Sequence, residues 1–242
     1  MAADKRTPLF EEDFADDAFR DRWVLEGFAD LMLGRDGDMP FLRMATTRNP
    51  ENPKNKQSVL WCRQRFPHDL RVQFRAQGAT ANRAIFYFNA VPMPDSGHET
   101  IFDWGRPDAE MTRYAGDSRI AMYTVGMLRD DEDKCNLRYI GGTISEAYAK
   151  LKFEPYQQAS IIESYASAFE GKPDTWFDFE VRVEGRRIAM DVNGQTMFDV
   201  EDRGRAGSDD WTWDPLSEPG WLAFRNFVPN EVCIAQLRVS GR

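Results

Sequence analysis

The stretch at residues 176–200 most constrains the fold, because it alternates apolar and polar side chains and contains a hairpin signal. The segment FDFEVRV at 177–183 places an apolar residue at every second position, which is typical of a half-buried strand. A second alternation begins at Ile188, and Asn193-Gly194 predicts a type I′ turn because both central residues of that turn need positive φ. Antiparallel strands joined by such short turns predict a sheet with one solvated face.

The rest of the chain repeats short apolar segments separated by turn-forming residues. Residues 48–57 are rich in proline and asparagine and predict a loop, and 92–113 form a long irregular segment of the kind that often carries function. Further strands are expected at residues 9–14, 23–27, 29–33, 41–46, 58–63, 70–76, 84–91, 119–129, 135–139, 221–227 and 232–239. This pattern predicts an all-β fold, a two-sheet antiparallel jelly-roll β-sandwich with a concave cleft. No linker divides residues 1–242, so we expect a single domain.

Composition excludes several classes of partner. The net charge of −9 argues against nucleic acid and against anionic membrane surfaces, and no apolar run is long enough to span a bilayer. The first residues lack a hydrophobic signal core, which leaves a cytoplasmic protein or a secreted or periplasmic one after leader removal. Cys62, Cys135 and Cys233 form no CxxC pair and are expected to be small buried thiols.

Side-chain parity along the apolar strands selects a second, polar and aromatic face. In RIAMYTVGMLR at 119–129 both parities are apolar, so we assign the cleft to the parity of Tyr123. The same test on the other strands completes a set that comprises Trp61, Tyr87, Asn89, Tyr123, Arg129, Asn136, Arg138, Trp221 and Arg225. Aromatic plates suit the C–H faces of sugar rings, and amides and guanidinium groups bind hydroxyls or a carboxylate. The set predicts an oligo- or polysaccharide as the partner.

Several blocks of the sequence resemble a known family. These are VLWCRQRFPHDLRVQF at 59–74, IFD at 101–103, RYAGDSRIAMYTVGMLR at 113–129, NLR at 136–138 and GWLAFRNF at 220–227. They resemble the bacterial DUF1961 proteins, which are related to YesU within the concanavalin A-like lectin/glucanase superfamily. The resemblance implies a jelly roll and a role in the handling of plant or algal polysaccharide. The chain departs from the family at Thr124, where such proteins tend to have histidine after the tyrosine.

The chemistry that we favour is β-elimination on a uronate-containing glycan. It needs an acid/base pair, for which we nominate Tyr123 and His98, and cations or amides that neutralise the uronate carboxylate. Two alternatives stay open: a lectin-like binding module without turnover, and a glycoside hydrolase that uses carboxylates such as Asp103. The retaining glucanases of the superfamily carry ExDxE on one strand, and no probable inner strand here has that spacing. No cofactor is required by this chemistry, although acidic turns such as Asp13, Asp16 and Asp17 suit a structural calcium ion.

Overall fold

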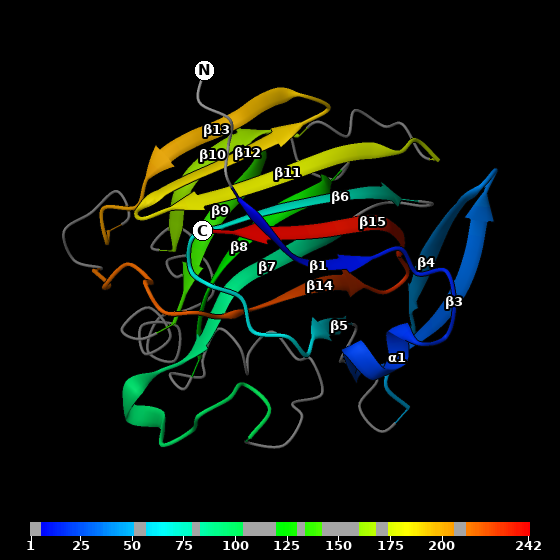
Figure 1. The fold of residues 1–242 in the computed structure, drawn as a ribbon, viewed down its shortest axis with the longest axis horizontal. Coiled ribbons are helices and arrows are strands. Elements are labelled where there is room, and N and C mark those ends of the chain that lie inside the picture. Colours follow the sequence, from blue (N-terminus) through cyan, green and yellow to red (C-terminus); the bar gives the residue numbers. More distant parts are fainter. Residues whose placement is uncertain are drawn as a thin grey trace.

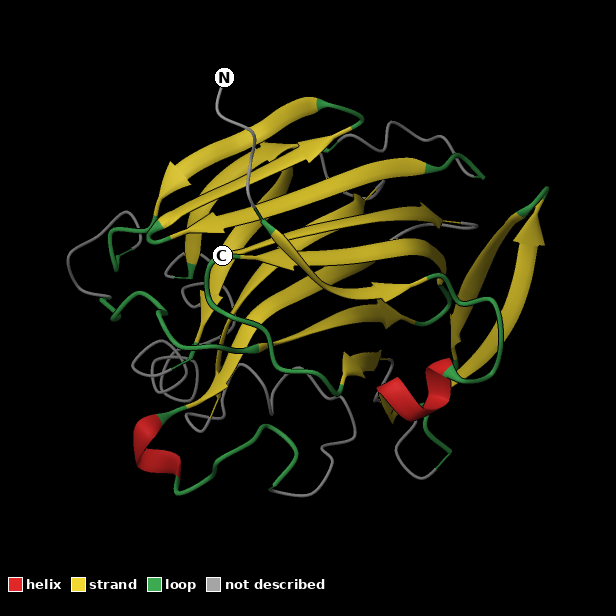
Figure 2. Ribbon diagram, in the orientation of Figure 1, coloured by secondary structure: helices red, strands yellow, loops and turns green. Residues whose placement is uncertain are grey.

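A computed structural model describes residues 6–50, 57–78, 83–103, 120–129, 134–141, 160–167, 174–205 and 212–242. These residues form two antiparallel sheets that stack face to face (Figures 1 and 2). The eight-stranded sheet contains β1 (Thr7–Glu12), β3 (Ala29–Asp36), β4 (Met39–Thr46), β6 (Leu70–Gly78), β11 (Phe177–Glu184), β12 (Arg187–Val192), β13 (Gln195–Glu201) and β15 (Glu231–Gly241). The seven-stranded sheet contains β2 (Trp23–Gly27), β5 (Gln57–Cys62), β7 (Arg83–Pro92), β8 (Ile120–Arg129), β9 (Lys134–Ile140), β10 (Ile161–Ala166) and β14 (Trp221–Phe227).

The strand order confirms the two-sheet sandwich. The eight-stranded sheet runs β13-β12-β11-β6-β15-β4-β3, with β1 paired to β15, and the seven-stranded sheet runs β10-β9-β8-β7-β14-β5-β2. The hairpin at Asn193-Gly194 is confirmed, with φ of 51° and 76° at these two residues. Its strands lie at one edge of the eight-stranded sheet, and β11 joins them to β6.

Two expectations about local structure were wrong. The helix α1 (Phe19–Arg22) replaces part of an expected turn, because Phe19 is buried in the core and anchors this segment. Strand β10 lies within the stretch that seemed ambiguous, since its segment IIESYA alternates poorly and only Tyr165 of that strand is buried. Neither the described helix α1 nor the 3₁₀ turn η1 (Pro94–Ser96) is long enough to cross a membrane.

The seven-stranded sheet is buried on both of its faces. Its inner face meets the eight-stranded sheet in a core where Phe74 lies 5.1 Å from both Phe86 and Phe224, and 5.2 Å from Phe179, between ring centroids. Its opposite face, called the outer face below, carries a second apolar cluster. That cluster comprises Val24, Val59, Trp61, Tyr87, Ala90, Ile101, Ile120, Met122, Ile140, Trp221 and Ala223. Alternate residues of one strand therefore belong to different clusters.

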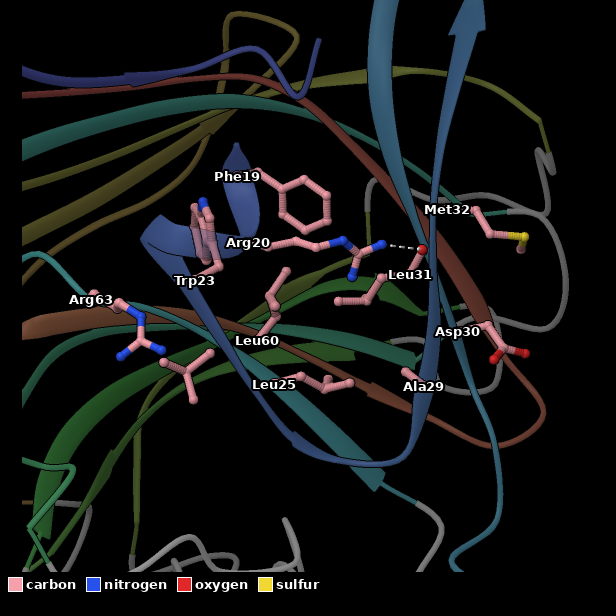
Figure 3. A pocket seen from close by; sticks show the side chains of 11 residues that line it. Phe19, Arg20, Trp23, Leu25, Ala29, Asp30, Leu31, Met32, Leu60 and Arg63 are labelled. Carbon is pink, nitrogen blue, oxygen red and sulfur yellow. Dashed lines mark hydrogen bonds between the residues drawn. The ribbon is translucent and has the colours of Figure 1, made fainter. Parts of the chain in front are cut away.

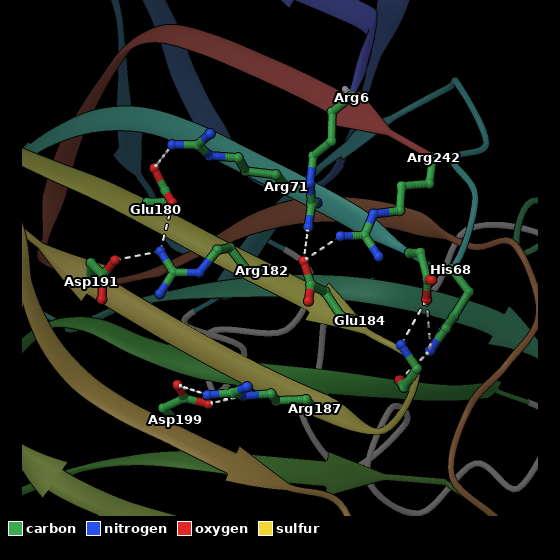
Figure 4. Close-up of polar contacts among 12 residues, drawn as sticks. Arg6, His68, Arg71, Glu180, Arg182, Glu184, Arg187, Asp191, Asp199 and Arg242 are labelled. Carbon is green, nitrogen blue, oxygen red and sulfur yellow. Dashed lines mark hydrogen bonds and ion pairs between the residues drawn. The ribbon is translucent and has the colours of Figure 1, made fainter. Parts of the chain in front are cut away.

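A network of ion pairs covers the exposed face of the eight-stranded sheet (Figure 4). Arg182 donates to Glu180 at 2.6 Å and also pairs with Asp191, while Arg71 donates to Glu180 at 2.6 Å. Hydrogen bonding to Arg182 lowers the pKa of Asp191, although burial opposes this. Burial alone would raise the pKa of Glu180, but the bonds from Arg71 and Arg182 outweigh it and the pKa is lowered. Both carboxyl groups are therefore held in their ionised form.

The three cysteines are free and buried, as expected. Burial raises the pKa of the Cys62 thiol to about 12 and that of Cys233 to about 11. These thiols are structural core groups, since a reactive cysteine needs an accessible thiolate.

We expect Phe74→Ala to lower the free energy of unfolding by about 3–5 kcal/mol, because truncation leaves a cavity among three aromatic rings. Urea unfolding followed by tryptophan fluorescence measures this loss. Met32→Ala is the matched control, since Met32 is 42% exposed and should cost far less. Equal losses in the two variants would contradict the described core.

The ion-pair network predicts a pH-dependent effect of Arg182→Met. The native pKa values of Glu180 and Asp191 lie below their ordinary values of 4.5 and 3.8, so the network stabilises the fold above those values. This contribution is lost as the pH falls through the lowered native values. The stability difference between wild type and Arg182→Met, measured by urea unfolding, should therefore be largest near neutral pH and shrink toward pH 3. A constant difference would contradict the ionised network.

Candidate functional site

The outer face brings together most of the residues that parity selected. Direct backbone pairing aligns Arg138 with Thr124, Thr124 with Tyr87, Tyr87 with Ala223, and Ala223 with Trp61. These five residues form one row across five neighbouring strands. Asn136, Trp221 and Arg225 share the same face by alternation with Leu137, Leu222 and Phe224, which point into the core. The shared face is therefore a confirmed prediction for Trp61, Tyr87, Asn136, Arg138, Trp221 and Arg225.

Arg225 organises the polar groups at the centre of this face. Its Nη1 donates to the Tyr87 hydroxyl at 2.6 Å, and its Nη2 donates to the Gln57 side-chain oxygen. Arg225 is 1% exposed and Tyr87 is 0% exposed, so this contact is shielded from water. Burial raises the pKa of the Tyr87 hydroxyl, and the positive charge of Arg225 only partly opposes this. Tyr87 is therefore a neutral hydrogen-bond and proton donor at neutral pH.

A second polar pair lies beside the first. The indole Nε1 of Trp61 donates to Glu26 Oε2 at 3.0 Å, and the ring centroids of Trp61 and Tyr87 are 5.8 Å apart. Glu26 is a buried carboxylate that sequence reasoning missed. Strand β2 carried the signal, since Val24 and Glu26 alternate with Trp23 and Leu25, which pack into the core.

The far side of the face is more accessible. Arg138 and Asn136 are half-buried on β9. Arg138 Nη1 donates to the Ser160 hydroxyl at 2.8 Å, and the Asn136 amide bonds the Ser164 hydroxyl at 2.7 Å. Most of the other side chains on this face are buried, so they do not line an open cleft.

The placement of Tyr123 on this face was wrong. Its ring lies in the inter-sheet core 5.5 Å from Phe88, and its hydroxyl donates to the buried Asp202 at 2.6 Å and accepts from the backbone N–H of Leu216 at 3.0 Å. Burial, followed by the negative charge of Asp202, raises its pKa. Because both parities of β8 are apolar, hydropathy alone gave no means to choose between them. Tyr123 is therefore on the opposite side of the sheet from Arg138 and Arg225.

Asn89 also lies away from the outer face. It occupies an irregularity of β7, with φ of 49°, and its amide donates to His68 Nδ1 at 2.7 Å and to the His68 carbonyl at 3.1 Å (Figure 4). His68 Nε2 in turn lies 2.8 Å from the Gly185 carbonyl oxygen. This chain of bonds ties β7 to turns at the ends of β6 and β11.

The loop that carries His98 and Asp103 is anchored against the outer face. Ile101 belongs to the outer cluster, and Phe102 packs edge-on against Trp221 at 6.0 Å. Asp103 itself is exposed and accepts from the Thr100 hydroxyl at 2.7 Å and the Thr100 N–H at 2.7 Å. These bonds, the side-chain one first, lower the pKa of Asp103. His98 is half-buried in the same loop.

Two other predictions have limited structural outcomes. Arg129 ends β8, and its side chain lies outside the described part of the molecule. Asp13 Oδ1 and Asp16 Oδ1 accept from the N–H groups of Ala15 and Ala18, and Asp17 pairs with Arg20. The described residues hold no cluster of three or more His, Cys, Asp or Glu suited to a metal ion.

A cavity of about 520 Å³ lies elsewhere, where the edge strands β2 and β3 diverge beside α1 (Figure 3). Leu25, Leu31 and Leu60 give it an apolar floor, and Arg20 reaches across it to the Leu31 carbonyl at 3.3 Å. It contains none of the predicted site residues and offers no group of convergent polar side chains. We therefore assign it to the open edge of the sandwich.

The comparisons with known proteins now place the fold. No family model matches the sequence, and no curated protein matches it. A protein of unknown function with a galectin-like fold from Bacillus subtilis superposes with a TM-score of 0.73 at 15% identity, covering 97% of this chain and 96% of that one. The laminarinase catalytic domain from Thermotoga maritima superposes with a TM-score of 0.59 at 12% identity and 98% coverage of each chain.

This chain has a galectin-like jelly-roll fold. A third similar structure, described with endo-acting O-glycanases of the human gut microbiota that initiate mucin breakdown, gives a TM-score of 0.57 at 14% identity. It covers 97% of this chain and 99% of that one. At these identities the similarity establishes the jelly roll and leaves the chemistry to the residues of this chain.

We expect Tyr123→Phe to lower the free energy of unfolding by about 1.5–3 kcal/mol, because Asp202 loses a buried donor. The same substitution should leave any sugar binding on the outer face unchanged. Thermal unfolding and a binding titration test the two halves of this prediction. Loss of binding without loss of stability would return Tyr123 to the site.

Proposed function

We propose that this jelly roll binds a glycan along the outer face of the seven-stranded sheet and acts on it. The observation that carries the proposal is the row of aromatic and polar groups that five strands align on that face. Trp61 and Tyr87 supply aromatic surface, and Arg138 and Asn136 supply half-buried groups that can bind hydroxyls or a carboxylate. The glycan-acting jelly rolls among the similar structures favour the same class of ligand.

The reaction that we favour is β-elimination on a uronate-containing glycan. In this reaction a base removes the C5 proton, the C4–O4 bond breaks as the C4–C5 double bond forms, and an acid protonates the departing O4. Arg225, with Arg138 and Asn136, would neutralise the uronate carboxylate and so favour loss of the C5 proton. The resemblance of the sequence to DUF1961 proteins favours a plant or algal polysaccharide as substrate.

We propose that Tyr87 replaces Tyr123 as the acid. It lies on the correct face, accepts a bond from Arg225, and remains protonated at neutral pH. His98 stays the proposed base, because its loop is anchored to the same face through Ile101 and Phe102. Since Tyr87 has no exposed surface, this reaction requires the side chains that bury it to move aside.

The burial of Tyr87 also favours the second candidate, a lectin-like module that uses the half-buried part of the face without turnover. The described structure gives the hydrolase less support. Among the described residues, the buried carboxylates are Glu12, Glu26 and Asp202. Only Glu26 belongs to the outer face, where it accepts the Trp61 indole. A two-carboxylate mechanism needs a second such group opposite it.

Arg138→Ala should weaken binding of the recognised glycan roughly tenfold, the cost of one charge-assisted contact. Isothermal titration against polygalacturonate, alginate and neutral β-glucan oligosaccharides measures this effect. Arg187→Ala is the matched control, because Arg187 is an exposed arginine on the other sheet. Equal affinities for wild type and Arg138→Ala would remove the outer face as the site.

Tyr87→Phe separates the lyase from the binding module. The lyase predicts that wild type releases unsaturated uronate, detected by ultraviolet absorbance, and that Tyr87→Phe loses at least a hundredfold in rate. Binding should persist in that variant. Reducing ends without ultraviolet absorbance would indicate a hydrolase, and binding by wild type without any product would indicate the module.

A further inference from the structure

The exposed face of the eight-stranded sheet contains a polar hollow of about 290 Å³ that the proposed function does not use. Direct backbone pairing aligns Arg238 with Gln73, Gln73 with Glu180, and Glu180 with Asp191. These residues give a polar row across β15, β6, β11 and β12. The hollow is lined by Gln73, Phe74, Arg75, Asp178, Phe179, Glu180, Asp191, Gly194, Gln236 and Arg238.

A β-bulge lies beside this hollow. Ala235 pairs with Arg75 and Arg238 pairs with Gln73, so two residues of β15 stand opposite Phe74 alone. Gln236, the first of the two, has φ of 52°, which is unusual for a residue with a side chain. Gln236 and Arg238 are both exposed, and the bulge directs their side chains to the side of the sheet that carries Gln73.

The walls of the hollow hold both an unused acceptor and an unused donor. Asp191 Oδ1 is shielded from solvent, and no described group makes a hydrogen bond of good geometry to it. Arg75 Nε is also shielded and lies 2.9 Å from Asp178 Oδ1, but without hydrogen-bond geometry. Buried polar atoms are normally satisfied by a partner. A hydroxyl group can donate to one such atom and accept from the other.

The charges around the hollow are already balanced. Arg71 and Arg182 flank Glu180, Arg182 also pairs with Asp191, and Arg75 lies against Asp178 (Figure 4). An anionic ligand would meet carboxylates, and a cationic ligand would meet guanidinium groups. Planar amides, guanidinium groups and carboxylates that are held rigidly suit the hydroxyls of a neutral polyol.

We propose that this hollow is a second glycan site, which binds one neutral sugar ring on the sheet opposite the outer face. Its volume lies at the small end of ligand pockets, so one ring fits and a longer chain extends beyond it. Arg238 and Gln236 contact the ring hydroxyls from one side, and Glu180 and Asp191 from the other. The site is independent of the outer face and needs no chemistry there.

The test is an amide NMR titration with neutral methyl glycosides of glucose, galactose, mannose and xylose, each to about 100 mM, because single-ring sites bind at millimolar strength. At least one glycoside should shift the amides of residues 73–75 and 236–238 in a saturable manner. A double variant, Gln236→Gly with Arg238→Ala, should weaken that binding at least fivefold. Glycine suits the positive φ at position 236, so the variant removes side chains without straining the bulge.

Two controls make the outcome decisive. Arg187→Ala, on β12 but outside the hollow, should leave the affinity unchanged, and so should Arg138→Ala on the outer face. If no glycoside shifts these amides, or if the double variant binds as wild type does, the second site is overturned. Shifts confined to β7, β9 and β14 would overturn it while leaving the outer-face site intact.

Discussion

The burial of the seven-stranded sheet on both faces is the constraint on which the rest of the structure depends. A sheet with one wet face needs one apolar parity per strand, but this sheet needs two. Its inner parity fills the sandwich core with rings such as Phe86 and Phe224, and its outer parity builds a separate cluster around Trp61 and Tyr87. Polar groups placed on the outer parity are therefore desolvated, and each needs a partner.

Arg225 and Glu26 show how that need is met. Arg225 is satisfied by Tyr87 and Gln57, and Glu26 is satisfied by the indole of Trp61. Keeping such groups out of water costs free energy, and apolar residues of similar size would pack there without that cost. Their presence on one face, beside the half-buried Arg138, is why we assign function to that face rather than to the more open apolar cavity beside α1.

Most of the fold could be predicted from the sequence, because strand periodicity and turn residues are local properties. The hairpin at Asn193-Gly194 is an example, since its turn needs positive φ wherever it occurs in a protein. The site was predicted less well, and Tyr123 shows why. Where both parities of a strand are apolar, only tertiary packing decides which one faces the second sheet.

Irregularities of the strands limited the prediction in a second way. The irregularity at Asn89 breaks the alternation of β7, so a residue assigned to the outer face instead bonds His68. The bulge at Gln236 similarly borders a hollow that no periodicity in the sequence announces. Glu26 was the exception, since its alternation with core residues in β2 was visible and went unused.

The central claim is that a glycan lies on the outer face of the jelly roll. Ile85 on β7 is half-buried there and carries methyl groups, so it reports directly on a bound sugar. Intermolecular NOEs from a bound uronate oligosaccharide to the Ile85 methyl protons are the expected result. NOEs to Leu31 in the cavity beside α1, with none to Ile85, would contradict the account.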